Sequence, residues 1–76
     1  MKERRFTKRQ EEVLQLLAEG LTDSEIARRL HLSVGTARTH VKHIREALGA
    51  RTRGEAVARA ISKGLIKPPN GENTQF

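Results

Sequence analysis

Only two residues, His31 and Leu32, separate two helical patterns in the middle of this chain, and this short spacing restricts the fold more than any other feature. The first pattern predicts a helix over residues 23–30, and Ser33 begins the next helix at once. Because two residues leave no room for a loop, the two helices must meet at a steep angle. The spacing therefore predicts a helix, a tight turn and a second helix.

The helix after the turn is the longest that the sequence predicts. Its apolar residues step by three or four positions along one seam, which consists of Val34, Ala37, Val41, Ile44 and Leu48. Gly49 supplies a residue that can end this helix. The pattern predicts a helix over about residues 34–48.

Hydroxyl residues mark the starts of the remaining helices. Thr7, Thr22 and Thr52 each stand three residues before a glutamine or glutamate, which is the capping-box pattern. Gly20 and Gly64 can end the first and the last helix. We therefore expect an all-α fold of four helices, arranged as a helix-turn-helix domain.

The chain has the length of one domain. Because so short a chain buries only about 60% of its unfolded surface, we expect very regular packing or a partner subunit. The pattern predicts a basic N-terminal lead over residues 1–6, the helical domain over residues 7–67 and a disordered tail over residues 68–76, which contains two prolines. Leu65 and Ile66 are expected to fold back on the core.

The charge of the chain predicts a polyanionic partner. The formal net charge is +6 and the pI is about 10.8. Nucleic acid is favoured over a membrane surface, because no apolar run approaches the roughly 20 residues that span a bilayer. Phe6 and Phe76 are the only aromatic residues, which favours double-stranded DNA over single strands that need stacking platforms. We expect a cytoplasmic protein.

The inventory of reactive residues argues against an enzyme. The sequence has one aspartate, no cysteine and no grouped serine, histidine and acid. His40 and His43 have a spacing that could suggest a metal, but zinc needs three or four ligands. We expect no catalytic residues, no metal and no cofactor.

The outer face of the long helix predicts contacts with DNA bases. Arg38 and Lys42 have donors for guanine acceptors, and Thr39 can contact a thymine methyl group or a phosphate. Gly35 allows a close approach of the backbone. Residues 38–53 contain five arginines or lysines against one acid. A basic helix after a tight turn is the helix that enters the major groove in DNA-binding proteins.

Phosphate contacts are predicted at helix starts and beside this face, where hydroxyls, free backbone amides and basic side chains suit phosphate oxygens. The candidates are Lys8, Thr22, Ser33, Thr36, His43 and Arg45. Thr22 and Ser33 have a competing role, because each is also predicted to cap its helix.

Three motifs carry a resemblance to a known family: TKRQEEVL near the start, GLTDSEIA before the turn and SVGTARTH at the start of the long helix. Over residues 6–66 the chain resembles the LuxR/GerE helix-turn-helix domain, the DNA-binding end of many bacterial response regulators and quorum sensors. The resemblance implies a four-helix LuxR-type domain whose third helix enters the major groove. His31 stands at a turn position where the family often has glycine, and a histidine tolerates a left-handed backbone there at modest strain. The resemblance also implies that the fourth helix forms the contact between two subunits.

Candidates for this dimer contact lie on the last helix. They are Ala56, Arg59, Ala60 and Lys63. The same periodicity is also compatible with a core role for the whole apolar stripe of this helix, which would leave the contact to neighbours such as Ala58 and Arg59. Periodicity alone does not separate the two arrangements.

These features predict a sequence-specific transcription regulator that binds duplex DNA as a homodimer. Symmetry then predicts an inverted repeat with half-sites about 10 base pairs apart. The alternative is a protein-interaction module that docks on RNA polymerase or on another regulator. Because Met1 stands only six residues before Thr7, we expect a free-standing domain, like the free-standing members of the family.

Overall fold

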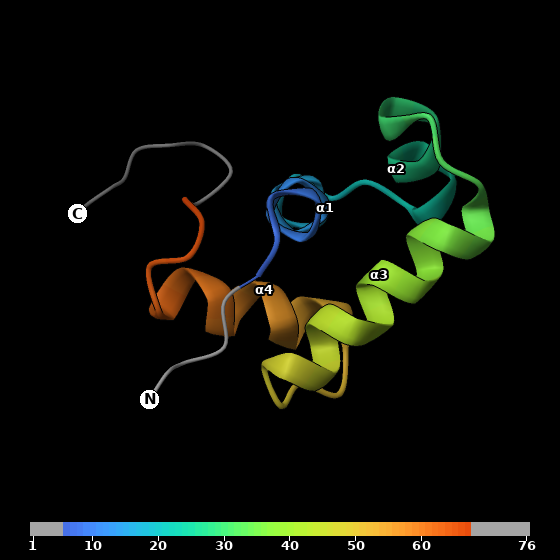
Figure 1. Ribbon diagram of the computed structural model, residues 1–76. Helices are drawn as coiled ribbons and strands as arrows, with labels where there is room; N and C mark the ends of the chain where they lie inside the picture. The colour runs from blue at the N-terminus through green and yellow to red at the C-terminus, as the bar shows by residue number, and fades with distance from the viewer. Residues whose placement is uncertain (1–5, 68–76) are drawn as a thin grey trace.

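The structure is a computed structural model that describes residues 6–67 (Figure 1). This part of the chain forms four helices and no strand: α1 (Lys8–Ala18), α2 (Asp23–Leu30), α3 (Val34–Ala47) and α4 (Arg53–Ser62). The predicted all-α, four-helix fold is confirmed, with α3 ending one residue before its predicted end. The predicted tail, and all of the predicted lead except Phe6, lie outside the described residues. Within residues 6–67, each helix is too short or too polar to cross a membrane.

Two of the three predicted capping boxes are complete. Thr7 and Thr22 each accept a hydrogen bond from the backbone N–H three residues on, and the side chain there accepts one in return. The third box is half formed. Thr52 Oγ1 accepts from the Glu55 N–H at 3.0 Å, as the pattern predicts, but Glu55 Oε1 accepts at 2.6 Å from the Arg51 N–H in place of the Thr52 N–H. The carboxylate thus ties the loop before α4 to the first turn of that helix.

The turn between α2 and α3 has the predicted left-handed residue. His31 has φ 60° and ψ 44°, which a histidine adopts at modest cost. The turn is closed by a hydrogen bond of 2.8 Å from the Leu32 N–H to the Ala27 carbonyl. This turn leads the chain directly from α2 into α3 (Figure 1).

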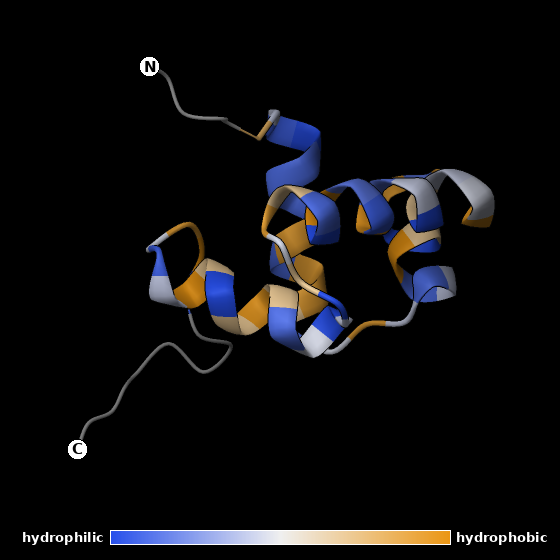
Figure 2. Cartoon of the chain, turned by 90° about the horizontal axis from the view of Figure 1, so that it is seen from below, coloured by the Kyte–Doolittle hydropathy of each residue, from blue (hydrophilic) through white to orange (hydrophobic). Residues whose placement is uncertain are grey.

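The four helices bury one shared apolar core. Figure 2 shows their apolar positions turned toward one another and their hydrophilic positions turned outward. The largest fully buried side chains are Val13, Leu14, Ile26 and Ile44. Helix α3 packs against each of the other three helices, so its orientation is fixed from three directions.

Two residues that the sequence assigned to the core are exposed instead. Val34 is 37% exposed, because it is the first residue of α3 and the buried seam begins one turn later, at Ala37. Leu65 is 44% exposed, whereas Ile66 folds back on the core as predicted. Consecutive residues outside a helix point in different directions, so only one of this pair reaches the core.

Candidate nucleic-acid interface

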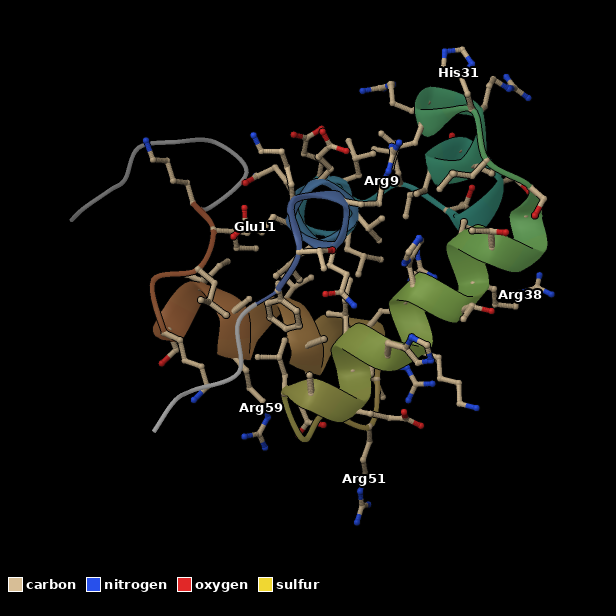
Figure 3. All side chains as sticks on the ribbon, viewed as in Figure 1. Arg9, Glu11, His31, Arg38, Arg51 and Arg59 are labelled. Atoms are coloured by element: carbon tan, nitrogen blue, oxygen red, sulfur yellow. The ribbon has the colours of Figure 1, made fainter. Side chains whose placement is uncertain are left out.

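The outer face of α3 presents the three residues that the sequence predicted to contact bases. Arg38, Thr39 and Lys42 are exposed, while Ala37 and Val41 on the inner face are buried. Figure 3 shows Arg38 pointing away from the body of the molecule. The packing of the inner face therefore sets the direction in which these three side chains project.

Two shallow hollows on this face gather most of the predicted site. The first is lined by Asp23, Gly35, Arg38, Thr39, Val41, Lys42, Arg45 and Arg53. The second is lined by Ser33, Gly35, Thr36, Thr39, His40 and His43. Gly35 and Thr39 belong to both hollows and form their common border. The structure thus brings together all three base-contact candidates and four of the six phosphate-contact candidates.

The remaining two phosphate candidates, Lys8 and Thr22, line neither hollow. Thr22 caps α2 through its Oγ1, which accepts from the Glu25 N–H at 3.1 Å, and it directly precedes Asp23 at the edge of the first hollow. Lys8 is exposed at the start of α1. Of these two residues, Thr22 lies closer along the chain to the α3 face.

The hydroxyl groups along α3 are held by local hydrogen bonds. Ser33 Oγ accepts from the Thr36 N–H at 3.0 Å and donates to Thr36 Oγ1 at 2.9 Å, so Ser33 caps the helix as predicted. Thr39 Oγ1 donates to the Gly35 carbonyl at 3.0 Å. Because the hydroxyl proton of Thr39 is already used, its methyl group is the part best suited to an outside contact.

Comparison with known proteins places this fold and face in a family. Residues 4–60 match the family described as bacterial regulatory proteins, luxR family. The chain belongs to this family. It is therefore a LuxR-type helix-turn-helix DNA-binding domain, as its resemblance implied, and the family comprises transcription regulators rather than enzymes.

The LuxR-type domain has close relatives among longer regulators. Over 62 residues, which are 82% of the chain, it is 44% identical to the transcriptional regulatory protein YxjL and 41% identical to the transcriptional regulatory protein DesR, both of Bacillus subtilis. The aligned part covers 28% of YxjL and 31% of DesR. The chain thus spans less than a third of the length of these relatives.

Two solved structures share the fold of the LuxR-type domain. The VqmA dimer of Vibrio cholerae, a LuxR-type receptor, has a TM-score of 0.78 and 28% identity over 87% of this chain and 31% of that one. The transcription factor GerE has a TM-score of 0.76 and 27% identity over 82% of this chain and 92% of that one. The four-helix arrangement is therefore that of the family.

An acid at the edge of the α3 face was missed by the sequence reasoning. Asp23 Oδ1 accepts from Arg53 Nη1 at 2.6 Å, and Asp23 Oδ2 accepts from Arg38 Nε at 3.3 Å. Arg53 Nη2 also donates to the Leu21 carbonyl at 2.7 Å. The one signal available was that the chain's single aspartate directly follows a helix cap in a strongly basic domain.

These arginines keep Asp23 charged. The hydrogen bond from Arg53 is the largest influence and lowers the pKa of the Asp23 carboxyl, burial opposes it, and the hydrogen bond from Arg38 adds to the lowering. The pKa of Glu25 is also lowered, mainly because its carboxylate accepts a hydrogen bond from the Thr22 N–H. The α2 N-terminus therefore carries two stable negative charges, which its helix dipole favours.

We predict that Asp23→Asn lowers the free energy of unfolding by about 1 kcal/mol at neutral pH. The pKa of Asp23 is lower in the folded chain than its ordinary value of 3.8, so its charge stabilises the fold above that value. The stabilisation is lost as the pH falls through the lowered pKa, so the two proteins should converge in strong acid. Urea unfolding followed by circular dichroism at neutral and acidic pH measures the free energy of unfolding of both proteins. A difference that stays constant across this range would contradict the ion pair's role.

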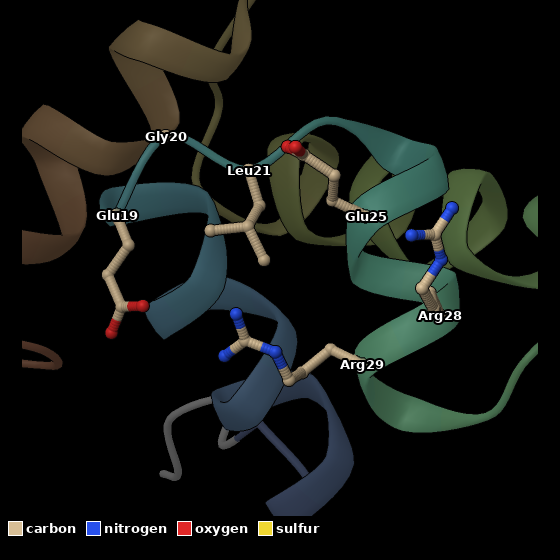
Figure 4. A pocket seen from close by; sticks show the side chains of 6 residues that line it. All are labelled: Glu19, Gly20, Leu21, Glu25, Arg28 and Arg29. Atoms are coloured by element: carbon tan, nitrogen blue, oxygen red, sulfur yellow. The ribbon is translucent and has the colours of Figure 1, made fainter.

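A separate hollow lies between the end of α1 and α2 (Figure 4). It is lined by Glu19, Gly20, Leu21, Glu25, Arg28 and Arg29, none of them from α3. These residues include no serine, cysteine or histidine. Within residues 6–67, no group of three or more histidines, cysteines or acids is placed to hold a metal.

Proposed function

We propose that this domain is a sequence-specific transcription regulator that inserts α3 into the major groove of duplex DNA. The observation that carries the proposal is the exposed row of Arg38, Thr39 and Lys42 on a helix whose other side is buried in the core. Arginine and lysine donors match the O6 and N7 acceptors of guanine, and the Thr39 methyl group matches the methyl group of thymine. A helix after a tight turn docks in this way.

Phosphate contacts at the edges of the groove would fix the position of α3. Ser33 and Thr36 lie at its N-terminus, where backbone amides and the helix dipole favour phosphate. Arg45 is half-buried on the flank, and its Nη1 donates to the Arg51 carbonyl at 3.4 Å. We include His43, Thr22 and Lys8 as further phosphate contacts. Contacts of this kind orient the protein and carry no sequence information themselves.

Selection from randomised duplexes tests the proposed function. The purified protein is incubated with the pool at physiological salt, and the bound fraction is sequenced. We expect enrichment of a two-fold symmetric site with half-sites about 10 base pairs apart. Failure to enrich any sequence would contradict sequence-specific binding and would favour the alternative, a module that docks on RNA polymerase or another regulator. We propose the cytoplasm as the site of action, where a bacterial regulator meets DNA.

The set of residues predicted for a dimer contact through α4 needs a correction. Ala56 and Ala60 are fully buried in the domain's own core, because α4 turns them toward the other helices. They have no surface left for a partner. Arg59 and Lys63 are exposed, and we propose that the contact uses this side of α4. The dimeric state named for VqmA supports a dimer here.

We predict that Arg59→Glu weakens binding to the full two-fold site by about tenfold or more, because losing the dimer removes the advantage of two linked half-sites. Figure 3 shows Arg59 pointing away from the core. The change also replaces the exposed ion pair of 3.5 Å between Arg59 and Glu55 with a repulsion, which costs little at the surface, so we expect the domain to stay folded. Gel-shift titration against the full site and a single half-site measures the effect. The half-site is the control, since repulsion of DNA by the new charge acts on both. Equal losses on both would show that Arg59 lies outside the dimer contact.

A further inference from the structure

The contact between Arg38 and Asp23 leaves a specific part of the arginine available. Arg38 is bound through Nε, at 3.3 Å from Asp23 Oδ2, and 70% of its side chain is exposed. A guanidinium that is bound through Nε keeps its two terminal Nη groups. Those two groups form the fork that fits the O6 and N7 atoms of guanine.

Asp23 is the fixed member of this contact. Its side chain is only 20% exposed, and it accepts from Arg53 Nη1 at 2.6 Å. Arg53, the first residue of α4, also donates to the Leu21 carbonyl at 2.7 Å. It therefore links Leu21, in the loop before α2, to Asp23, the first residue of α2. Asp23 therefore presents a carboxylate held by Arg53 to the largely exposed side chain of Arg38.

We propose that Asp23, held by Arg53, is a positioning residue that aims the Nη groups of Arg38 at a guanine in the target site. The inference rests on the proposed function and adds to it how the arginine is directed. A free arginine loses much rotamer freedom when it binds a base, and a side chain restricted beforehand loses less. Three helices thus cooperate in one base contact: α4 holds Asp23 on α2, and Asp23 directs Arg38 on α3.

Electrostatics alone predicts a different effect of Asp23, which makes the inference testable. A carboxylate at the edge of the DNA-facing surface repels phosphate, so removing its charge should strengthen binding to all duplexes alike. If Asp23 positions Arg38, removing it should instead reduce the preference for guanine over another base. The first effect changes the affinity for every duplex by the same factor. The second changes the ratio between the affinities for duplexes with and without the guanine.

The guanine that Arg38 contacts is first located as the base pair at which Arg38→Ala loses discrimination. The experiment then measures dissociation constants for the selected duplex and for a duplex in which this guanine is replaced. Asp23→Asn, Arg38→Ala and the double variant are compared with the unaltered chain. We expect Asp23→Asn to reduce the preference for guanine by about three- to tenfold, with no further loss when Arg38 is already absent. Glu46→Gln is the matched control, because it removes one negative charge from an exposed position on α3 and should leave the preference unchanged.

A preference unchanged by Asp23→Asn would overturn the inference, and so would the same loss in the presence and absence of Arg38. A lower melting temperature with a normal preference would also overturn it, since Asp23 would then act on the fold alone. Exchange of the Arg38 Nε proton, followed by NMR without DNA, should quicken in Asp23→Asn. If the unaltered chain selected no sequence, the proposed function would fail first, whereas a selected site that tolerates Asp23→Asn would defeat only the positioning role.

Discussion

Replacing Ile44 with alanine is expected to remove a large part of the stability of this domain. Ile44 is fully buried on the inner face of α3, where that helix packs against the other three. Truncating a buried isoleucine costs about 2–5 kcal/mol, through lost apolar burial and the cavity that remains. A chain of this size is stabilised by only about 4–11 kcal/mol. Urea unfolding followed by circular dichroism should show a large fall in the midpoint.

Val34→Ala is the matched control, because Val34 is an apolar residue of the same helix that is 37% exposed. We expect it to cost less than about 1 kcal/mol, since little buried volume is removed. Similar losses for the two variants would contradict the placement of the core seam.

Replacing Arg38 with alanine is expected to reduce discrimination at one base pair by about 1–3 kcal/mol. The two terminal donors of its guanidinium would be lost. We expect Lys42→Ala to act in the same way at another base pair. Competition binding against all single-base variants of the selected site measures both effects.

Arg45→Ala provides the contrast. As a proposed phosphate contact, Arg45 should strengthen binding to every sequence alike, and its loss should reduce the slope of log affinity against log salt by about 1. Selected and random duplexes should be affected equally. Equal losses on selected and random DNA for Arg38→Ala, Lys42→Ala and Arg45→Ala alike would contradict the division into base and phosphate contacts.

The helices could be predicted from the sequence because their signals are local. The threonine caps, the glycines and the apolar steps of α3 all act within a few residues of one another, and His31 adopts the left-handed backbone at the turn position where the family often has glycine. The local signal failed at Glu55, whose carboxylate accepts from the N–H of Arg51 and not from the neighbouring N–H of Thr52. The capping-box pattern does not distinguish between them.

What the sequence left open depends on contacts between distant segments. Asp23 and Arg53 are 30 residues apart, and no periodic pattern links them. The burial of Ala56 and Ala60 likewise depends on which side of α4 packs on the core, which the apolar stripe did not decide. The outer face of α3 was predictable because a single helix carries both its buried seam and its exposed row.

The packing of α3 against all three other helices has a consequence for how this domain can diverge. Its inner residues cannot change singly without loss of packing, whereas exposed positions such as Thr39 and Lys42 can change without loss of packing. New target sequences can therefore evolve on an unaltered scaffold. Position 38 is the exception: a replacement there would leave Asp23 without one of its two cationic partners, so we expect residues 23 and 38 to change together among descendants of this chain.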